Sequence, residues 1–188
     1  MEKIILASNS PRRKEFIALL GLEFEVITKD IEEIIDQNIL PEDLVEDLAF
    51  QKAYAVFQDH KDRVVIGFDT LVYTDTQILG KPRDEEDAIR MLMCLSGKTH
   101  YVVTGVSILA KKMSRTFHSK TKVTFYPMTQ KEIEEYVNTK EPLDKAGAYG
   151  AQGYGSKFIK EMDGDFFTVV GLPLSKLYQE LKALEIIT

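Results

Sequence analysis

The sequence predicts an α/β protein in which helices pack on a mixed, twisted β-sheet. In the first half of the 188 residues, short apolar runs typical of buried strands alternate with helical patterns, whereas long strand-like segments dominate the second half. Hydrophobic residues make up 44% of the chain, which is enough for a sizeable core. Because this length fits one domain of ordinary size, we expect a single domain over residues 1–188.

The first two elements are predicted to be a strand and a helix that follows it directly. Residues 4–7 form a short apolar run, as expected for a buried strand. Ser10 then suits the N-cap of a helix, Pro11 its first position, and Gly21 its end. Residues 24–28 alternate between apolar and polar side chains and are interpreted as a second strand.

The next helix is predicted to be long and to begin at Pro41. Its apolar stripe runs from Leu44 to Phe57. Lys52 falls within this stripe, four residues after Leu48. A lysine in that position either extends its ammonium group along the apolar surface to solvent or is held there for a functional reason.

The most apolar strand is predicted at residues 64–68, with Asp69 and Thr70 at its carboxyl end. Open α/β sheets bind ligands beyond the carboxyl ends of their strands. Asp69 is therefore either a turn residue or a ligand-binding carboxylate. The pair Glu32-Glu33 could supply a second hard oxygen ligand for Mg²⁺, although acidic pairs in loops are usually only solvated.

Helix caps mark the boundaries of the later helices. Asp84 suits the N-cap of one helix, and Thr129 with Glu132 forms a capping box for the next. Pro173 is expected to start the last helix. Cys94 falls in an apolar helical stretch and is interpreted as a core thiol.

Strand pairs are predicted between these helices. Residues 99–126 contain two long segments that we expect to pair. Residues 157–162 and 166–170 are separated by Asp163-Gly164, a turn sequence that predicts a hairpin.

The composition argues against several classes of protein. The 24 Lys and Arg residues against 30 Asp and Glu residues give a net charge of −6, which disfavours binding to nucleic acid or an anionic membrane. No apolar run exceeds five residues, whereas a membrane span needs about 20, and the apolar stretch at the N-terminus is too short for a signal peptide. The single cysteine excludes an intramolecular disulfide and multi-cysteine metal sites. We therefore expect a soluble, cytoplasmic protein.

The segment between the first strand and the first helix has the composition of an anion site. Backbone N–H groups at the start of a helix attract anions. The hydroxyls of Ser8 and Ser10 and the guanidinium groups of Arg12 and Arg13 would add charge-assisted contacts to phosphate. The alternative is a capped helix with two solvated arginines, and this stretch alone favours neither interpretation.

Two further stretches are candidates for ligand binding. Lys81, in Gly80-Lys81-Pro82, is either a phosphate-binding cation or part of a simple turn. Residues 145–153 carry a glycine at every third position together with Ala and Tyr, whereas a flexible linker would favour Ser. Glycines allow the backbone to approach a flat or phosphorylated ligand, and the amide of Gln152 could then read a base edge.

Together these segments resemble the Maf family of nucleoside triphosphate pyrophosphatases, also called septum-formation-inhibitor-like proteins. The resemblance covers the chain from Ile4 to about Leu184. Each motif is short, but the set in this order and at these spacings is highly specific. The motifs are S-N-S-P-R-R at 8–13, I-E-E at 31–33, Q-K-A at 51–53, G-F-D-T at 67–70, G-K-P-R at 80–83, L-S-G at 95–97, D-K-A-G-A-Y-G-A-Q-G at 144–153, D-G-D at 163–165 and V-G-L-P-L at 170–174.

The resemblance extends to one branch of the family, which cleaves dTTP and UTP. The marks of that branch are Arg, Thr and Gln at the positions of Arg12, Thr70 and Gln152. The sister branch that acts on 7-methyl-GTP has an aromatic residue, Gln and Glu there. Phe68 and Ala151 depart from the family pattern, in which a small residue and Ile are expected, but neither change removes a chemical group.

The resemblance implies a Maf and inosine-triphosphatase-like fold with a central nucleotide-binding cleft. It implies the hydrolysis of a nucleoside triphosphate to the monophosphate and diphosphate by attack of water at the α-phosphorus. The cofactor implied is a divalent cation, Mg²⁺ or Mn²⁺. The implied roles are triphosphate binding by Ser8, Ser10 and Arg13, catalysis by Lys52 and Lys81, metal binding by Glu33 and Asp69, proton acceptance by Asp69, and pyrimidine recognition by Arg12, Thr70 and Gln152.

The partner implied is a small-molecule nucleoside triphosphate, with no nucleic acid and no membrane, and a homodimer is the assembly considered. The role implied is house-cleaning, in which noncanonical or modified pyrimidine nucleotides are removed before they enter nucleic acid. Two alternatives remain open at this point. One is a non-enzymatic regulator of septum formation that acts by protein binding, and the other is a 7-methyl-GTP pyrophosphatase.

Overall fold

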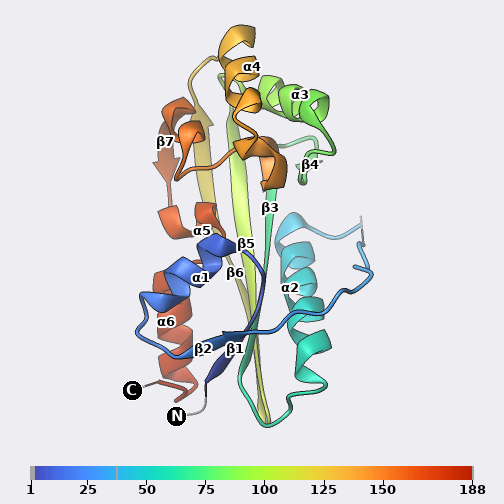
Figure 1. Cartoon of the computed structure of the whole chain (residues 1–188), viewed down its shortest axis with the longest axis vertical. Helices are drawn as coiled ribbons and strands as arrows, with labels where there is room; N and C mark the ends of the chain where they lie inside the picture. The colour runs from blue at the N-terminus through green and yellow to red at the C-terminus, as the bar shows by residue number, and fades with distance from the viewer. Residues whose placement is uncertain (1–2, 37, 188) are drawn as a thin grey trace. The chain divides into compact units, whose positions relative to one another are not determined.

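The structure is a computed structural model that describes residues 3–36 and 38–187. Within these residues, seven strands form one sheet in the order β2-β1-β3-β5-β6-β7, and β4 pairs with β3 (Figure 1). The strands are β1 (Ile4–Ala7), β2 (Phe24–Val26), β3 (Val65–Tyr73), β4 (Ile78–Leu79), β5 (Thr99–Ala110), β6 (Met113–Phe125) and β7 (Ile159–Asp163). The α-helices are α1 (Pro11–Ala18), α2 (Pro41–Phe57), α3 (Glu85–Leu95), α4 (Gln130–Asn138), α5 (Phe166–Val170) and α6 (Leu174–Ala183). The mixed α/β class predicted from the sequence is confirmed.

The chain divides into two compact units. The first unit comprises Met1–Asp69, Thr104–Ser119 and Gly171–Thr188, and the second comprises Thr70–Val103 and Lys120–Val170. The division follows contacts within the chain and does not test the predicted single domain, which stays a prediction.

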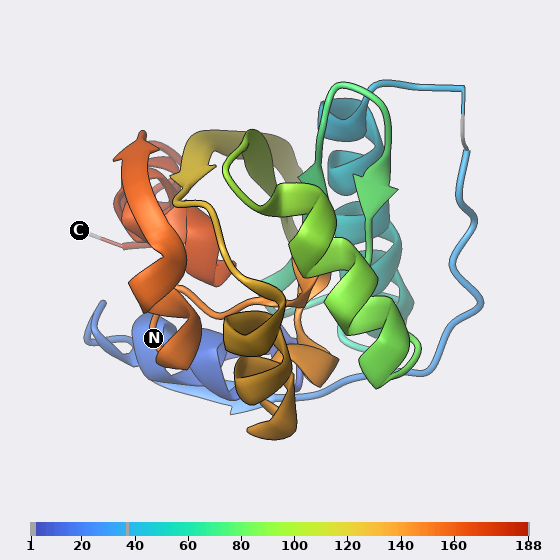
Figure 2. The same cartoon turned by 90° about the horizontal axis from the view of Figure 1, so that it is seen from above.

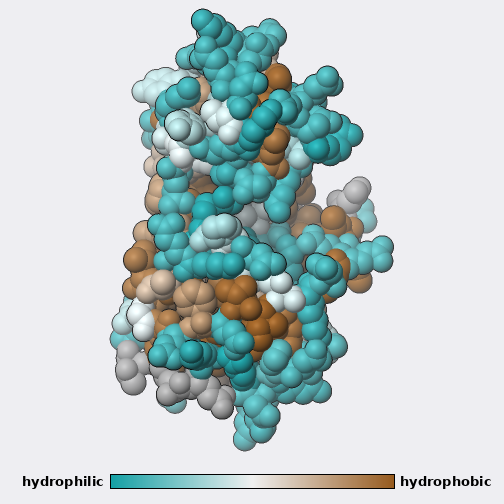
Figure 3. Space-filling model, viewed as in Figure 1, coloured by the Kyte–Doolittle hydropathy of each residue, from teal (hydrophilic) through white to brown (hydrophobic). Residues whose placement is uncertain are grey.

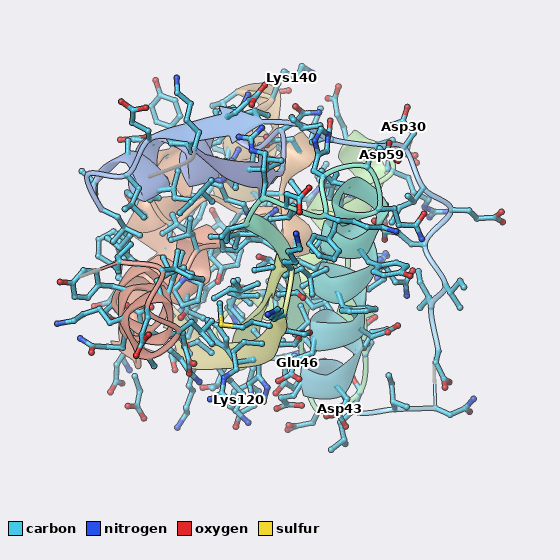
Figure 4. All side chains as sticks on the ribbon, turned by 90° about the horizontal axis from the view of Figure 1, so that it is seen from below. Asp30, Asp43, Glu46, Asp59, Lys120 and Lys140 are labelled. Atoms are coloured by element: carbon cyan, nitrogen blue, oxygen red, sulfur yellow. The ribbon has the colours of Figure 1, made fainter. Side chains whose placement is uncertain are left out.

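In the first unit, β1 is the central parallel strand, with β2 on one side and β3 on the other. Helices α1 and α6 lie on one face of these strands, and α2 lies on the other (Figures 1 and 2). The acids Glu42 and Asp43 occupy the first turn of α2, where the helix dipole favours negative charge, and Figure 4 shows Asp43 and Glu46 at this end of the helix.

In the second unit, an apolar cluster joins the helices to the strands. It includes Leu92 from α3, Val102 from β5, Phe125 from β6 and Tyr136 from α4, each less than 2% exposed. The sheet continues here through an antiparallel pairing of β6 with β7, in which Lys122 faces Asp163.

Polar side chains predominate on one face of the protein. Figure 3 shows mainly hydrophilic side chains there, with smaller hydrophobic areas between them. Among the described residues, no helix combines the length and the apolar character that a membrane crossing needs.

The capping signals in the sequence predicted the helix starts correctly. The carboxylate of Asp84 accepts a hydrogen bond from the backbone N–H of Asp87, and Thr129 and Glu132 form both bonds of the capping box. Pro41 occupies the first turn of α2, and Pro173 is the N-cap of α6.

The predicted hairpin over 157–170 is wrong in its second half. Residues 166–170 form α5, because the carboxylate of Asp165 accepts hydrogen bonds from the backbone N–H groups of Phe167 and Thr168 and from the Thr168 hydroxyl. This arrangement caps a helix. The strand β7 therefore pairs with β6 instead.

Two smaller predictions also need correction. The apolar strand at 64–68 extends to Tyr73, because Leu71 and Val72 are buried as well, and Asp69 therefore lies inside β3 instead of at its carboxyl end. Cys94 is only half-buried, and its sulfur accepts a hydrogen bond from the Gln77 amide at 3.1 Å.

Candidate active site

The structure separates the predicted site residues into two sets, one in each unit. The first unit contains Ser8, Ser10, Arg12, Arg13, Glu33, Lys52 and Asp69. The second unit contains Thr70, Lys81 and Gln152.

Lys52 joins two carboxylates in the first unit. Its Nζ lies 3.0 Å from Oε1 of Glu33 and donates a short hydrogen bond to Oδ1 of Asp69. The Lys52 side chain is 26% exposed and that of Asp69 only 13%. Lys52 is therefore not a lysine that only extends to solvent, and three of the predicted residues meet at one point.

A glycine on β3 brings α2 close enough for this contact. A Cβ atom added to Gly67 would lie 2.5 Å from the carbonyl oxygen of Ala49 and 2.7 Å from the backbone nitrogen of Ala53. Alternate residues of a strand share one face, so Asp69 projects on the same face as Gly67. Because Ala53 directly follows Lys52, the close approach at Gly67 also sets the separation of Lys52 from Asp69.

The side chain of Gln51 ties the loop that carries Glu33 to α2. The Gln51 amide accepts a hydrogen bond from the backbone N–H of Ile34 and donates one to its carbonyl oxygen, both at 2.9 Å. Glu33 precedes Ile34 and is thereby held beside Lys52. We did not predict this role of Gln51, although its place next to Lys52 in the Q-K-A motif was an available signal.

Arg13 is fixed by three acceptors within the first unit. Its Nε donates to the carbonyl oxygen of Gly171 at 2.8 Å, and its Nη1 donates to Oγ of Ser8 at 3.1 Å and to the carbonyl oxygen of Phe68 at 3.4 Å. The guanidinium carbon also lies 5.4 Å from the centre of the Phe68 ring. The alternative of two solvated arginines is therefore wrong for Arg13.

Burial perturbs the charged groups near Arg13. Burial lowers the pKa of Arg13 to about 10, an effect that the Asp69 carboxylate opposes, so the guanidinium stays charged at neutral pH. Burial also raises the pKa of Asp69 above its usual value. The nearby cations Lys52 and Arg13 act in the opposite direction, and Glu33 adds to the rise.

The two predicted serines lie at the start of α1. Ser8 is buried, and its hydroxyl accepts a hydrogen bond from the backbone N–H of Ser10 at 3.3 Å as well as the bond from Arg13. Ser10 occupies the N-cap position, but its side chain makes no capping bond to the described part of α1. Arg12, in the first turn, is half-buried.

In the second unit, the turn with Lys81 contacts the glycine-rich segment. The backbone N–H of Gly147 donates to the carbonyl oxygen of Gly80 at 3.1 Å. Lys81 and Gln152 are exposed, and Thr70 is half-buried in β3. The close approach expected of the glycines is present at Gly147, where a Cβ atom would lie 2.9 Å from the Val72 side chain.

We did not predict Glu141, which lies just before the glycine-rich segment. Its carboxylate accepts hydrogen bonds from the Tyr136 hydroxyl at 2.8 Å and from the backbone N–H of Tyr154 at 2.8 Å. Every residue type except proline has a backbone N–H donor, so the sequence does not reveal such a contact. Only the position of an acid beside this segment could have suggested it.

The first comparison with known proteins concerns the fold. The Staphylococcus aureus Ham1 protein has a similar structure, with a TM-score of 0.56 over 98% of this chain and all of that chain. At 15% sequence identity the likeness concerns the fold alone. It matches the inosine-triphosphatase-like α/β architecture expected from the sequence.

The sequence comparisons identify the family. The Maf-like protein model matches residues 3–184, so this chain belongs to the Maf family. A Bacillus cereus (strain AH820) protein named dTTP/UTP pyrophosphatase is 53% identical over 186 residues, which are 99% of this chain and 97% of that protein. A Bacillus anthracis (strain CDC 684 / NRRL 3495) protein of the same name is 52% identical with the same coverage. The family resemblance drawn from the motifs is therefore confirmed.

Proposed function

We propose that this protein is a nucleoside triphosphate pyrophosphatase that hydrolyses dTTP and UTP to the monophosphate and diphosphate. The observation that carries the proposal is the convergence of Lys52, Glu33 and Asp69 within the first unit. The names of the Bacillus relatives, similar along the whole chain, support the same activity.

Hydrolysis at the α-phosphorus develops negative charge on the phosphoryl oxygens and on the departing diphosphate, so the site needs fixed cations. Arg13 is suited to this task, because its guanidinium group stays charged and its acceptors fix its position before substrate binds. We assign Lys52 and Lys81 to the same task. Ser8 orients Arg13, and Ser10 lies where the start of α1 can approach a phosphate.

The residues present fit a divalent cation, which we assign to Glu33 and Asp69. Both carboxylates contact the same ammonium group, so their oxygens already converge on one cation. No group of three His, Cys, Asp or Glu side chains suited to a metal occurs in the described chain. Two carboxylates nevertheless suffice for Mg²⁺ or Mn²⁺ when phosphate oxygens and water complete the coordination. The bound cation would neutralise charge on the phosphates.

Asp69 is assigned a second role, which is to accept the proton of the attacking water. Its carboxylate is the more buried of the two, and burial raises its pKa, which makes it a stronger proton acceptor than an exposed aspartate, although Lys52 and Arg13 oppose the rise. Glu33 is closer to solvent and is assigned metal binding alone.

The preference for pyrimidines is assigned to Arg12, Thr70 and Gln152, which are the three marks of the dTTP and UTP branch. We infer that modified pyrimidine nucleotides are also substrates and that the activity removes them in the cytoplasm. The partner proposed is the nucleotide alone, without nucleic acid or membrane. The assembly considered is a homodimer, and the mass of the protein in solution tests it.

The test measures diphosphate release from a panel of dTTP, UTP, the other common nucleoside triphosphates and 7-methyl-GTP, with Mg²⁺, with Mn²⁺ and with a chelator. We expect dTTP and UTP to be cleaved fastest and the chelator to abolish turnover. Faster cleavage of 7-methyl-GTP would assign the chain to the sister branch. No release from any nucleotide would favour the non-enzymatic regulator of septum formation.

A further inference from the structure

The carboxylate of Glu141 lies at the centre of the loop that carries Gln152. Its Oε2 accepts a hydrogen bond from the backbone N–H of Tyr154 at 2.8 Å. Its Oε1 accepts one from the backbone N–H of Gly155 at 3.2 Å and another from the Tyr136 hydroxyl at 2.8 Å. Hydrogen bonds to a carboxylate are stronger than those between neutral groups, so Glu141 is a strong attachment point for the loop.

Tyr136 extends the attachment to the other side of Gln152. Its hydroxyl is a donor to Glu141 and also accepts a hydrogen bond from the backbone N–H of Gly150 at 3.0 Å. Burial and the neighbouring Glu141 raise the pKa of Tyr136, so the hydroxyl keeps its proton and remains a donor. The Tyr136 side chain is 1% exposed and packs against the Phe158 ring, which anchors the network in the core.

The Glu141 carboxylate accounts for the glycine at 153. A Cβ atom at Gly153 would lie 2.1 Å from Oε2 of Glu141, whereas one at Gly150 would lie 2.8 Å from Cε of Lys145 and 3.0 Å from Oε1 of Glu141. The backbone therefore wraps directly around the Glu141 carboxylate, and no other residue type at 153 permits the wrapping without movement.

The chain enters this loop through a strained turn. Lys140, labelled in Figure 4, has a φ of 63°, which is rare for a residue with a side chain, and its Nζ lies 2.5 Å from Oε1 of Glu85. The turn directs Glu141 back toward the segment 150–155. At the next turn, the Lys145 ammonium donates to the carbonyl oxygen of Glu141 at 2.6 Å.

We propose that Glu141 is a positioning residue that sets nucleotide specificity by holding the backbone on both sides of Gln152. Gln152 itself is exposed, while Gly150 and Tyr154, two residues away in each direction, are held by the Tyr136–Glu141 pair. The side chain of Gln152 is therefore presented from a fixed backbone. The inference rests on the proposed function, in which Gln152 recognises the pyrimidine.

Because the loop is already fixed, it loses less conformational entropy when the base binds. The base is remote from the reacting phosphorus, so a loosened loop weakens substrate binding and base discrimination more than the chemical step. The loss should appear mainly in KM and in the ratio of kcat/KM values between pyrimidine and purine nucleotides.

The test compares Glu141→Gln, Gln152→Ala and the double variant, with Glu134→Gln as the matched control. Glu134 is an exposed acid on α4 whose carboxylate accepts a hydrogen bond from Gln130. The Glu141→Gln amide keeps the size of the side chain but loses its charge and offers one acceptor oxygen in place of two. KM for dTTP and UTP and the preference over dGTP are measured for each protein, alongside a thermal melt.

We expect Glu141→Gln to raise KM about tenfold, the effect of one charge-assisted hydrogen bond, with kcat changed much less. We expect no further rise when it is combined with Gln152→Ala, because both changes remove the same recognition. Glu134→Gln should match the wild type. If Glu141→Gln does not fold, Tyr136→Phe, which removes the hydroxyl from the same network, is tested in its place with the same expectation.

Two outcomes would overturn the inference while leaving the proposed function intact. One is a Glu141→Gln protein with unchanged KM while Gln152→Ala impairs pyrimidine binding. The other is additive effects in the double variant, which would indicate a structural role unrelated to Gln152. If Gln152→Ala itself leaves specificity unchanged, the assignment of Gln152 fails, and the inference about Glu141 is refuted with it.

Discussion

Replacing Gly67 with alanine should separate Lys52 from Asp69 without touching either side chain. The added Cβ atom would lie 2.5 Å from the Ala49 carbonyl oxygen, 2.7 Å from the Ala53 nitrogen and 2.8 Å from the Ala53 Cβ atom. The two nearest atoms belong to the backbone of α2, so no side-chain rotation can relieve the overlap. The helix as a whole must move away from β3.

The size of that movement follows from the contact distances. Carbon and oxygen atoms in ordinary contact are about 3.5 Å apart, so the segment around Ala49 must retreat by roughly 1 Å. Overpacking of this kind costs about 1–3 kcal/mol, which lowers the Tm of a chain of this length by about 2–12 °C. A misplacement of about 1 Å in a catalytic group lowers turnover by about 10²-fold.

The assay measures dTTP turnover and a thermal melt for Gly67→Ala. Gly80→Ala serves as the control for the melt, because a Cβ atom there meets no atom of the described chain within 4 Å. We expect Gly80→Ala to melt as the wild type does. Turnover of Gly67→Ala within twofold of the wild type, with an unchanged Tm, would refute the reasoning that this glycine sets the Lys52–Asp69 distance.

Three other predictions concern single groups. Asp69→Asn should lower dTTP turnover by about 10²–10⁴-fold at saturating Mn²⁺ while the protein still melts cooperatively, and a folded variant with more than about a tenth of wild-type activity would contradict the proton-accepting role. Lys52→Ala should reduce turnover and also lower the Tm, because it leaves the Asp69 carboxylate without its nearest cation, and wild-type kinetics would remove Lys52 from the site. Burial lowers the pKa of His100 to about 4 from the usual 6.5, so acidification through this range protonates the unfolded chain first. The free energy of unfolding should then fall by about 3 kcal/mol between pH 7 and pH 4, and this loss should shrink in His100→Gln when both are measured by urea titration.

Local signals explain which parts of the fold could be predicted. The caps at Asp84 and Thr129 bind backbone groups within three residues, so the sequence contains the whole interaction. Asp163-Gly164 was misleading because it suits a hairpin turn, whereas Asp165 caps a helix one residue later. The glycine at 164 therefore need not indicate a hairpin turn, because a Cβ atom at this position would lie 2.7 Å from Oγ1 of Thr121.

The site was harder to predict because its contacts are long-range. Lys52 on α2 lies 17 residues before Asp69 on β3, and it also contacts Glu33 in the loop that precedes α2. Taken alone, each of these three residues fits an ordinary structural role. The phase of Lys52 in the apolar stripe was the one local sign of its burial. Gln51 and Glu141 bind backbone groups of other segments, so the only signals in the sequence were their positions beside Lys52 and beside the glycine-rich segment.

The charges of the cluster in the first unit explain why an additional cation is needed to bind a triphosphate. Arg13 and Lys52 supply two positive charges, and Glu33 and Asp69 supply two negative ones, so this cluster is neutral as a set. A neutral cluster gives no net attraction to a polyanion, and the two carboxylates repel it directly. Lys52 cannot be the only counter-charge for the substrate, because its ammonium group is already shared by both acids. A divalent cation held by Glu33 and Asp69 would give the cluster a net positive charge and would leave the Lys52 ammonium group available to the phosphates. The same carboxylates that neutralise the free site would then become the reason that it binds a nucleotide.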